Sequence, residues 1–196
     1  MTALVPLSRL PSIPVGATQK LEPLTQDDYE RLKAALPDYR YVLLAKVLRN
    51  TGLRETEVMA RSAEFFYADG PFHFIRTRRG KRTGAPVWED VALNPELGLE
   101  IEHYIKVNRL APGDRVFRFS ARQFQRVFRA AAESALGRAA HPHQLRALFT
   151  ATLIEGGVPV GVAASLLGHS DERTTLRHYM HLSRDKRAEI ARRMPV

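Results

Sequence analysis

The sequence predicts a mainly α-helical fold with a small three-stranded antiparallel sheet. Apolar residues recur at helical spacing along most of the chain. One stretch, residues 64–93, differs, because it holds three β-like segments separated by Asp69-Gly70 and by a basic loop that contains glycine. Short connections of this kind join antiparallel strands, so we expect a small antiparallel sheet among helices.

The first 24 residues contain four prolines and show no sustained helical or strand period. This composition is typical of an extended arm or linker. The folded part is expected to begin at Thr25, because Thr25 and Asp28 have the spacing of a helix N-cap with an acidic first turn. The first helix then continues to residue 36, and Pro37 ends it.

The remaining elements are bounded by turn residues. Thr51 and Gly52 end the second helix, Gly137 ends a later one, and Gly156-Gly157 follows another. Predicted helices after the first cover residues 39–50, 54–61, 95–108, 122–136, 143–155, 160–167, 174–182 and 184–194, and predicted strands cover 64–68, 72–77 and 87–93. We therefore expect an arm over residues 1–24, one domain over 25–182 and a helical tail over 183–196.

The charge balance favours an anionic partner, of which nucleic acid is the commonest. Lys and Arg number 30 against 21 Asp and Glu, which gives a formal net charge of +9. A basic surface kept for solubility is the alternative, and charge alone does not separate the two.

The absence of cysteine excludes disulfides, thiolate metal sites and cysteine nucleophiles, and it fits a cytoplasmic location. The sequence has neither a membrane-length apolar run nor a secretory signal.

Three motifs near the C-terminus carry side chains suited to phosphate chemistry. His143 and Arg146 stand three positions apart in a predicted helix and so share one face, where an arginine fork matches two phosphate oxygens. Gly168 would let a helix stop and place His169 at the mouth of a cleft. Tyr179 is a nucleophile only if neighbouring cations favour its phenolate, because a free phenol has a pKa of about 10. Taken singly, each motif is more simply a surface or packing residue.

Two further motifs lie upstream. Thr51-Gly52-Leu53-Arg54 is a tight turn that delivers Arg54 to a helix start, although Arg54 would equally pair with Glu57 at the surface. Five of the seven residues 76–82 are basic, and a basic hairpin tip suits DNA grooves and phosphates, with a solvated turn as the alternative. The arginines of this loop that we expect to contact DNA are Arg76, Arg78, Arg79 and Arg82.

Together and in this order, the motifs resemble the catalytic domain of the tyrosine recombinases, the phage integrase family. That family shows a TGLR-type turn, a lysine on a β-hairpin, HxxR, LGH and a tyrosine near the C-terminus. The interval from His169 to Tyr179 is one residue longer here than in many members, and the hairpin lacks the usual pattern after Gly-Lys. The matching residues, within residues 25–190, are Arg54, Lys81, His143, Arg146, His169 and Tyr179.

The resemblance implies the tyrosine recombinase catalytic-domain fold and an enzyme that cuts and rejoins DNA. Tyr179 would attack a phosphodiester, form a 3′-phosphotyrosyl link and release a 5′-hydroxyl, while Arg54 and Arg146 hold the phosphate oxygens. The chemistry implied needs no metal, ATP or other cofactor. The remaining implied roles are general acid for Lys81, proton transfer at Tyr179 for His143, and a hydrogen bond to the phosphate for His169.

The implied partners are double-stranded DNA and further copies of the chain, as a tetramer on DNA. Only about 24 residues precede the expected catalytic part, where family members usually carry a DNA-clamping domain. Three explanations stay open: a truncated chain, a naturally minimal recombinase, or a protein that depends on an accessory DNA-binding partner. The tail over 183–196 either packs on a neighbouring protomer or folds back. Two rival functions stay open: type IB topoisomerase-like relaxation, and a DNA-binding regulator on the same fold. The target site and the direction of recombination are not encoded in any motif.

Overall fold

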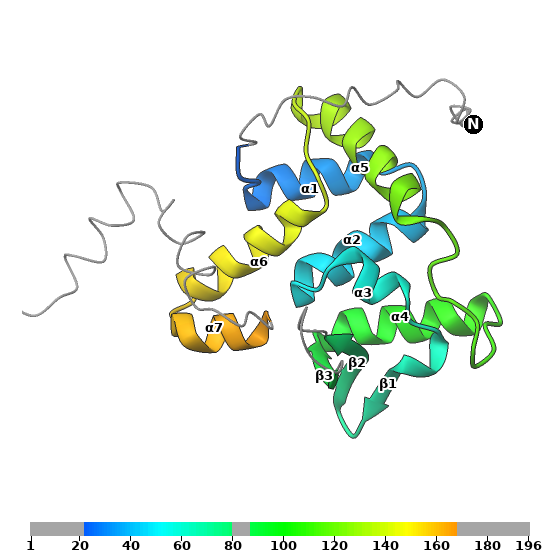
Figure 1. The fold of residues 1–196 in the computed structure, drawn as a ribbon. Helices are drawn as coiled ribbons and strands as arrows, with labels where there is room; N and C mark the ends of the chain where they lie inside the picture. The colour runs from blue at the N-terminus through cyan, green and yellow to red at the C-terminus, as the bar shows by residue number, and fades with distance from the viewer. Residues whose placement is uncertain (1–21, 80–86, 168–196) are drawn as a thin grey trace, which may run out of the picture. The chain divides into compact units, whose positions relative to one another are not determined.

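The structure, a computed structural model, describes residues 22–79 and 87–167, and in this part helices accompany one small sheet (Figure 1). The chain divides into two compact units, Met1–Phe149 and Thr150–Val196. The predicted fold class, mainly α with a three-stranded antiparallel sheet, is confirmed. The elements in chain order are α1 (Gln26–Ala35), α2 (Tyr39–Thr51), α3 (Glu55–Met59), a 3-10 turn (Ala63–Phe65), β1 (Phe66–Asp69), β2 (Phe72–Arg79), β3 (Val87–Leu93), α4 (Pro95–Val107), α5 (Ala121–Leu136), α6 (His143–Glu155) and α7 (Val160–Leu166).

Most predicted boundaries agree with the structure to within two residues, and those of α6 and β3 coincide with it. The first strand was predicted too early, because residues 63–65 form a 3-10 turn in which the N–H of Phe65 donates to the carbonyl of Ser62. The helix predicted over 54–61 ends at Met59. The helices predicted over 174–182 and 184–194, and most of the predicted arm, lie outside the described residues.

The start of α1 confirms the predicted N-cap. The Thr25 hydroxyl accepts the N–H of Asp28 at 3.1 Å, and the Asp28 carboxylate accepts the N–H of Thr25 at 3.1 Å. This reciprocal pair satisfies two backbone donors that the first helical turn leaves without partners. The sequence pattern therefore correctly predicts where α1 begins.

The sheet has two faces of different character. Along β2, His73, Ile75 and Thr77 are buried, whereas Arg76 and Arg78 between them are exposed, as strand alternation requires. The buried face is covered by α4, which contacts β1 and β2 (Figure 1). Gly98 permits this close approach, because a Cβ at that position would lie 2.2 Å from the ring of His73. The face with the arginines is therefore the outer face of the sheet.

One continuous hydrophobic core supports the helices of the first unit. Phe124 and Phe128 of α5 are fully buried, and the ring centroids of Phe124 and Tyr41 lie 6.3 Å apart. Helix α1 packs along α5 on this core (Figure 1). In the part of the chain that the structure describes, no helix combines the length and the apolar character that crossing a membrane requires.

Replacing Phe124 with alanine should lower the free energy of unfolding by about 3–5 kcal/mol, because a buried aromatic ring is lost and a cavity remains. Urea unfolding followed by circular dichroism would measure the change. The matched control is Leu99→Ala, since Leu99 is 58% exposed on α4 and its loss should cost no more than about 0.5 kcal/mol. Equal losses for the two variants would contradict the core described here.

Candidate active site

The turn between α2 and α3 is built to deliver Arg54. Gly52 ends α2 in the left-handed conformation, with a φ of 64°, which favours glycine. The hydroxyl of Thr51 donates to the carbonyl of Val47 at 2.7 Å and accepts the N–H of Leu53 at 3.2 Å. Leu53 is buried, so the turn is anchored from both sides and Arg54 becomes the N-cap of α3.

The side chain of Arg54 is exposed and is oriented by Glu57. The Glu57 carboxylate accepts the backbone N–H of Arg54 at 2.7 Å and its Nη1 at 2.9 Å. The pairing foreseen as an alternative for Arg54 is therefore present. Among the described residues only Nη1 of this guanidinium has a protein acceptor, and an arginine carries five N–H donors. Arg54 is thus held in place while most of its donors stay available.

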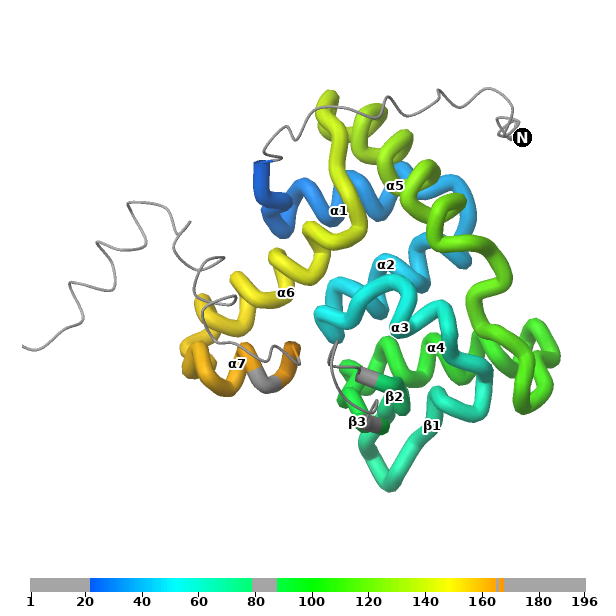
Figure 2. The backbone as a smooth tube through the Cα atoms, viewed as in Figure 1, coloured from blue at the N-terminus to red at the C-terminus, as the bar shows by residue number. Residues whose placement is uncertain are grey.

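Arg146 reaches the same turn from α6. Its side chain is 4% exposed, and its Nη1 donates to the backbone carbonyl of Gly52. The tube in Figure 2 shows the start of α6 beside the chain that passes from α2 into α3. The two predicted arginine motifs, far apart in the sequence, therefore meet at one turn.

A cavity of about 360 Å³ opens beside this turn. Two predicted site residues, Arg54 and His143, line it, so an anion in the cavity would meet a guanidinium and an imidazole. The full lining is Leu53, Arg54, Glu55, Thr56, Gln125, His141, Pro142 and His143.

Four polar residues of the cavity were not predicted as site residues: Glu55, Thr56, Gln125 and His141. The side-chain amide of Gln125 donates to the carboxylate of Glu55. Burial raises the pKa of Glu55, against weaker opposing effects of the Gln125 hydrogen bond and of His141. The His-Pro-His spacing was a signal for His141, whereas nothing local pointed to Gln125, which comes from α5.

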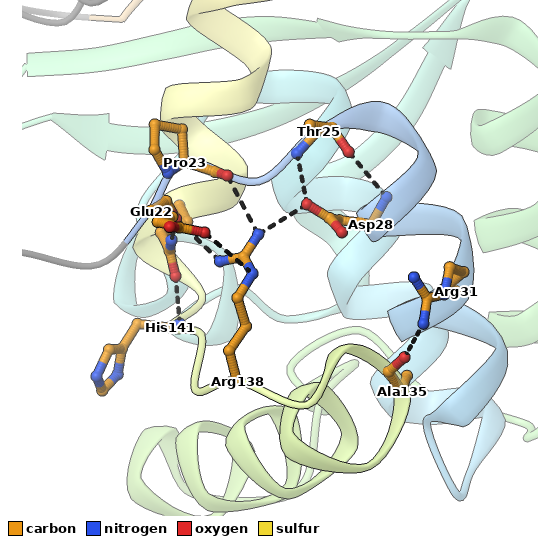
Figure 3. A network of polar contacts seen from close by, with 9 residues as sticks. Glu22, Pro23, Thr25, Asp28, Arg31, Ala135, Arg138 and His141 are labelled. Carbon is orange, nitrogen blue, oxygen red and sulfur yellow. Dashed lines mark hydrogen bonds and ion pairs between the residues drawn. The ribbon is translucent and has the colours of Figure 1, made fainter.

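The position of the α6 N-terminus is fixed by a polar network (Figure 3). The side-chain oxygen of Gln144 accepts the N–H of His141 at 2.8 Å, and its amide donates to the carbonyl of Glu22 at 2.6 Å. Arg138 donates to the same carbonyl at 3.1 Å and pairs with Asp28 at 2.7 Å. The imidazole of His141 points away from this network and lines the cavity. The segment before α1 is therefore tied to the residues that precede His143.

The predicted DNA contacts differ in their surroundings. Arg76 pairs with Asp90 through two nitrogens, at 2.7 and 2.9 Å. Arg78 is exposed, and its guanidinium lies 5.4 Å from the ring centre of Trp88. The remaining predicted residues fall outside the described part: the side chain of Arg79 and the whole of Lys81, Arg82, His169 and Tyr179.

The chain is similar in sequence to proteins of the phage integrase family. Residues 22–186 match the model of the phage integrase family. Tyrosine recombinase XerC of Erythrobacter litoralis is 32% identical over 148 residues, covering 73% of this chain and 46% of the relative. A tyrosine recombinase of Pseudothermotoga lettingae is 28% identical over 156 residues, covering 77% and 52%. The chain therefore spans about half the length of these curated relatives.

Solved structures share the fold. The crystal structure of XerA recombinase superposes with a TM-score of 0.72 at 21% identity, covering 94% of this chain and 68% of that one. The XerH site-specific recombinase bound to its palindromic difH substrate gives a TM-score of 0.69 at 18% identity, covering 86% and 52%. These likenesses confirm the tyrosine recombinase catalytic-domain fold that the sequence predicted.

The Glu55 carboxyl should make stability depend on pH. Burial raises the pKa of Glu55 above its ordinary value of 4.5, so the protonated form of the carboxyl is favoured in the folded state. The stability that this gives is fully present below pH 4.5. It is lost as the pH rises through the folded-state pKa, because the carboxylate is then charged while partly buried. Glu55→Gln removes this loss, so the unfolding free energy of the variant should rise relative to wild type as the pH increases above 4.5. Urea unfolding at several pH values would measure the difference. A difference that is constant or falls with pH would contradict the raised pKa.

Proposed function

We propose that this chain, which belongs to the phage integrase family, is a site-specific recombinase that cuts and rejoins double-stranded DNA through a 3′-phosphotyrosyl intermediate. The observation that carries the proposal is the contact of Arg146 with the Gly52 carbonyl, in the turn that delivers Arg54. This contact brings the helix that carries Arg146 to the turn that carries Arg54, although the two arginines are far apart in the sequence. The printed names of the relatives, tyrosine recombinases, support the same reaction.

Two fixed arginines suit phosphoryl transfer because the displacement develops negative charge on the phosphate oxygens. Arg146 is buried and held by a backbone carbonyl, and Arg54 is held by Glu57. Charges that are already in position need no reorganisation when the reaction occurs. They therefore stabilise the transition state more than mobile side chains would. In this proposal the arginines supply the charge stabilisation of the reaction.

The covalent step in this proposal begins at Tyr179. Its oxygen bonds to the phosphorus, the bond from phosphorus to the 5′-oxygen breaks, and the DNA 3′-phosphate remains on the enzyme. A second 5′-hydroxyl reverses the step and reseals a strand, so no ATP is consumed because the bond energy is retained. The other roles proposed are protonation of the leaving oxygen by Lys81, acceptance of the tyrosine proton by His143, and a hydrogen bond from His169 to the phosphate.

The proposal extends to partners. The basic strand and loop, with Arg76, Arg78, Arg79 and Arg82, would contact the duplex near the cleavage point. We propose a homo-tetramer on DNA, acting in the cytoplasm, with an accessory DNA-binding partner. A solved relative, lambda integrase, is a dimer bound to a core site, which supports action by more than one protomer.

Incubation with a nicked suicide DNA substrate should give a covalent complex on a denaturing gel, with EDTA present and ATP absent. Tyr179→Phe should form no complex, and Arg54→Ala should slow its formation roughly 10²–10³-fold, the usual effect of losing one charge-stabilising group. Arg40→Ala is the control, because Arg40 is paired with Asp38 outside the cavity and its loss should not affect the rate.

A complex with the Phe variant, or none with wild type on any substrate, would refute the proposed nucleophile. Plasmid relaxation without exchange between paired sites would favour topoisomerase activity. Salt-dependent DNA binding without cleavage would favour a DNA-binding regulator.

A further inference from the structure

Three arginines gather on the outer face of the sheet and on the loop beside it. Arg61 follows α3, Arg78 lies on β2, and Arg115 belongs to the connection between α4 and α5. A bridge between Ser62 and Arg115 brings these segments together. We call Arg61, Arg78 and Arg115 the arginine cluster. None of them lines the active-site cavity.

Two aromatic rings hold Arg61 and Arg78 of the cluster. Phe65 and Trp88 stack with their centroids 5.2 Å apart and their planes at 8°. The guanidinium of Arg61 lies 5.4 Å from the Phe65 ring and 5.3 Å from the Trp88 ring, and that of Arg78 lies 5.4 Å from Trp88. Contacts with ring faces position a guanidinium without using its in-plane N–H donors. The donors of Arg78, which is exposed, are therefore left for another acceptor.

The cluster carries positive charge that the described residues do not neutralise. Within residues 22–79 and 87–167, none of the three arginines forms an ion pair with a carboxylate, and the Nε of Arg61 is buried without a hydrogen-bond partner. Burial lowers the pKa of Arg61, and the charges of Arg78 and Arg115 lower it further, as expected for neighbouring cations. Neighbouring cations without carboxylate partners favour an anionic ligand.

The acids next to the cluster are each engaged by other groups. Asp114 precedes Arg115 in the chain, Asp90 lies on the strand next to Arg78, and Glu64 lies close to Arg61 in sequence. Their partners are Arg118 for Asp114 at 2.9 Å, Arg76 for Asp90 at 2.7 Å, and the Ser62 hydroxyl and Gly113 N–H for Glu64 at 2.9 and 2.7 Å.

We infer that the arginine cluster binds the phosphate backbone of double-stranded DNA. An arginine guanidinium can donate two hydrogen bonds to the oxygens of one phosphate. The phosphates of a DNA backbone are regularly spaced, so one duplex can contact several guanidiniums at once. Arg78 also lies on β2 and directly precedes the basic residues 79–82 in the sequence, which we propose to contact the duplex. The choice of DNA as partner rests on the proposed function. Arg61 and Arg115 are contacts beyond those of the basic loop.

The affinity of the full chain for a duplex, measured at several salt concentrations, tests this inference. Each phosphate contact contributes about 0.9 to the slope of log affinity against log salt. Arg78→Gln and Arg115→Gln should each lower the slope by about that amount and should weaken binding several-fold at physiological salt. Both side chains are exposed, so the variants should unfold at the wild-type temperature.

The matched control is Arg118→Gln, which removes the same charge three residues from Arg115 but from a side chain paired with Asp114. Its slope should equal that of wild type. Slopes of the cluster variants equal to the control would overturn the inference, even if wild type forms the covalent complex with suicide DNA. Lowered slopes in a protein that forms no such complex would uphold the inference and refute the proposed function. Equal weakening on an acidic polypeptide of matched charge would also overturn it, since the cluster would then recognise charge without DNA.

Discussion

The hydrogen bond from Arg146 to the carbonyl of Gly52 joins the two halves of the candidate active site. Because Gly52 leaves the helical conformation, its carbonyl lies at a helix end where backbone acceptors lack intrahelical partners. Arg146 is buried, and a buried guanidinium must find acceptors to offset the loss of water. The bond meets both needs at once, and it fixes α6 against the turn that carries Arg54.

Other contacts make this joint rigid. Glu57 orients Arg54, and the hydroxyl of Thr77 donates to the Glu57 carbonyl at 3.1 Å, which attaches β2 to α3. Gln144 ties the start of α6 to the segment before α1. The site is thus assembled from several segments, each anchored by at least one hydrogen bond to another. A preorganised arrangement of this kind is what charge stabilisation in phosphoryl transfer requires.

The two faces of the sheet have different roles: one packs against α4, and the other presents arginines to solvent. Strand alternation places His73 and Ile75 against α4 and leaves Arg78 outside. On the outer face, aromatic rings hold guanidiniums in place, whereas Asp90 neutralises Arg76. Arginines that are alike in sequence therefore differ in the charge that they present to a ligand.

Local sequence signals were sufficient to predict the fold class, the arginine motifs and, to within two residues, most element boundaries in the described part, because caps, turns and periodicity act over a few residues. The Thr25 N-cap and the Gly52 turn are examples. Local signals did not determine the 3-10 turn before β1, the Glu55–Gln125 pair, or which arginines lack a carboxylate. These features depend on burial and on partners far apart in the chain, so no local pattern predicts them. Arg146 and Gly52, separated by 94 positions, meet only when the core packs.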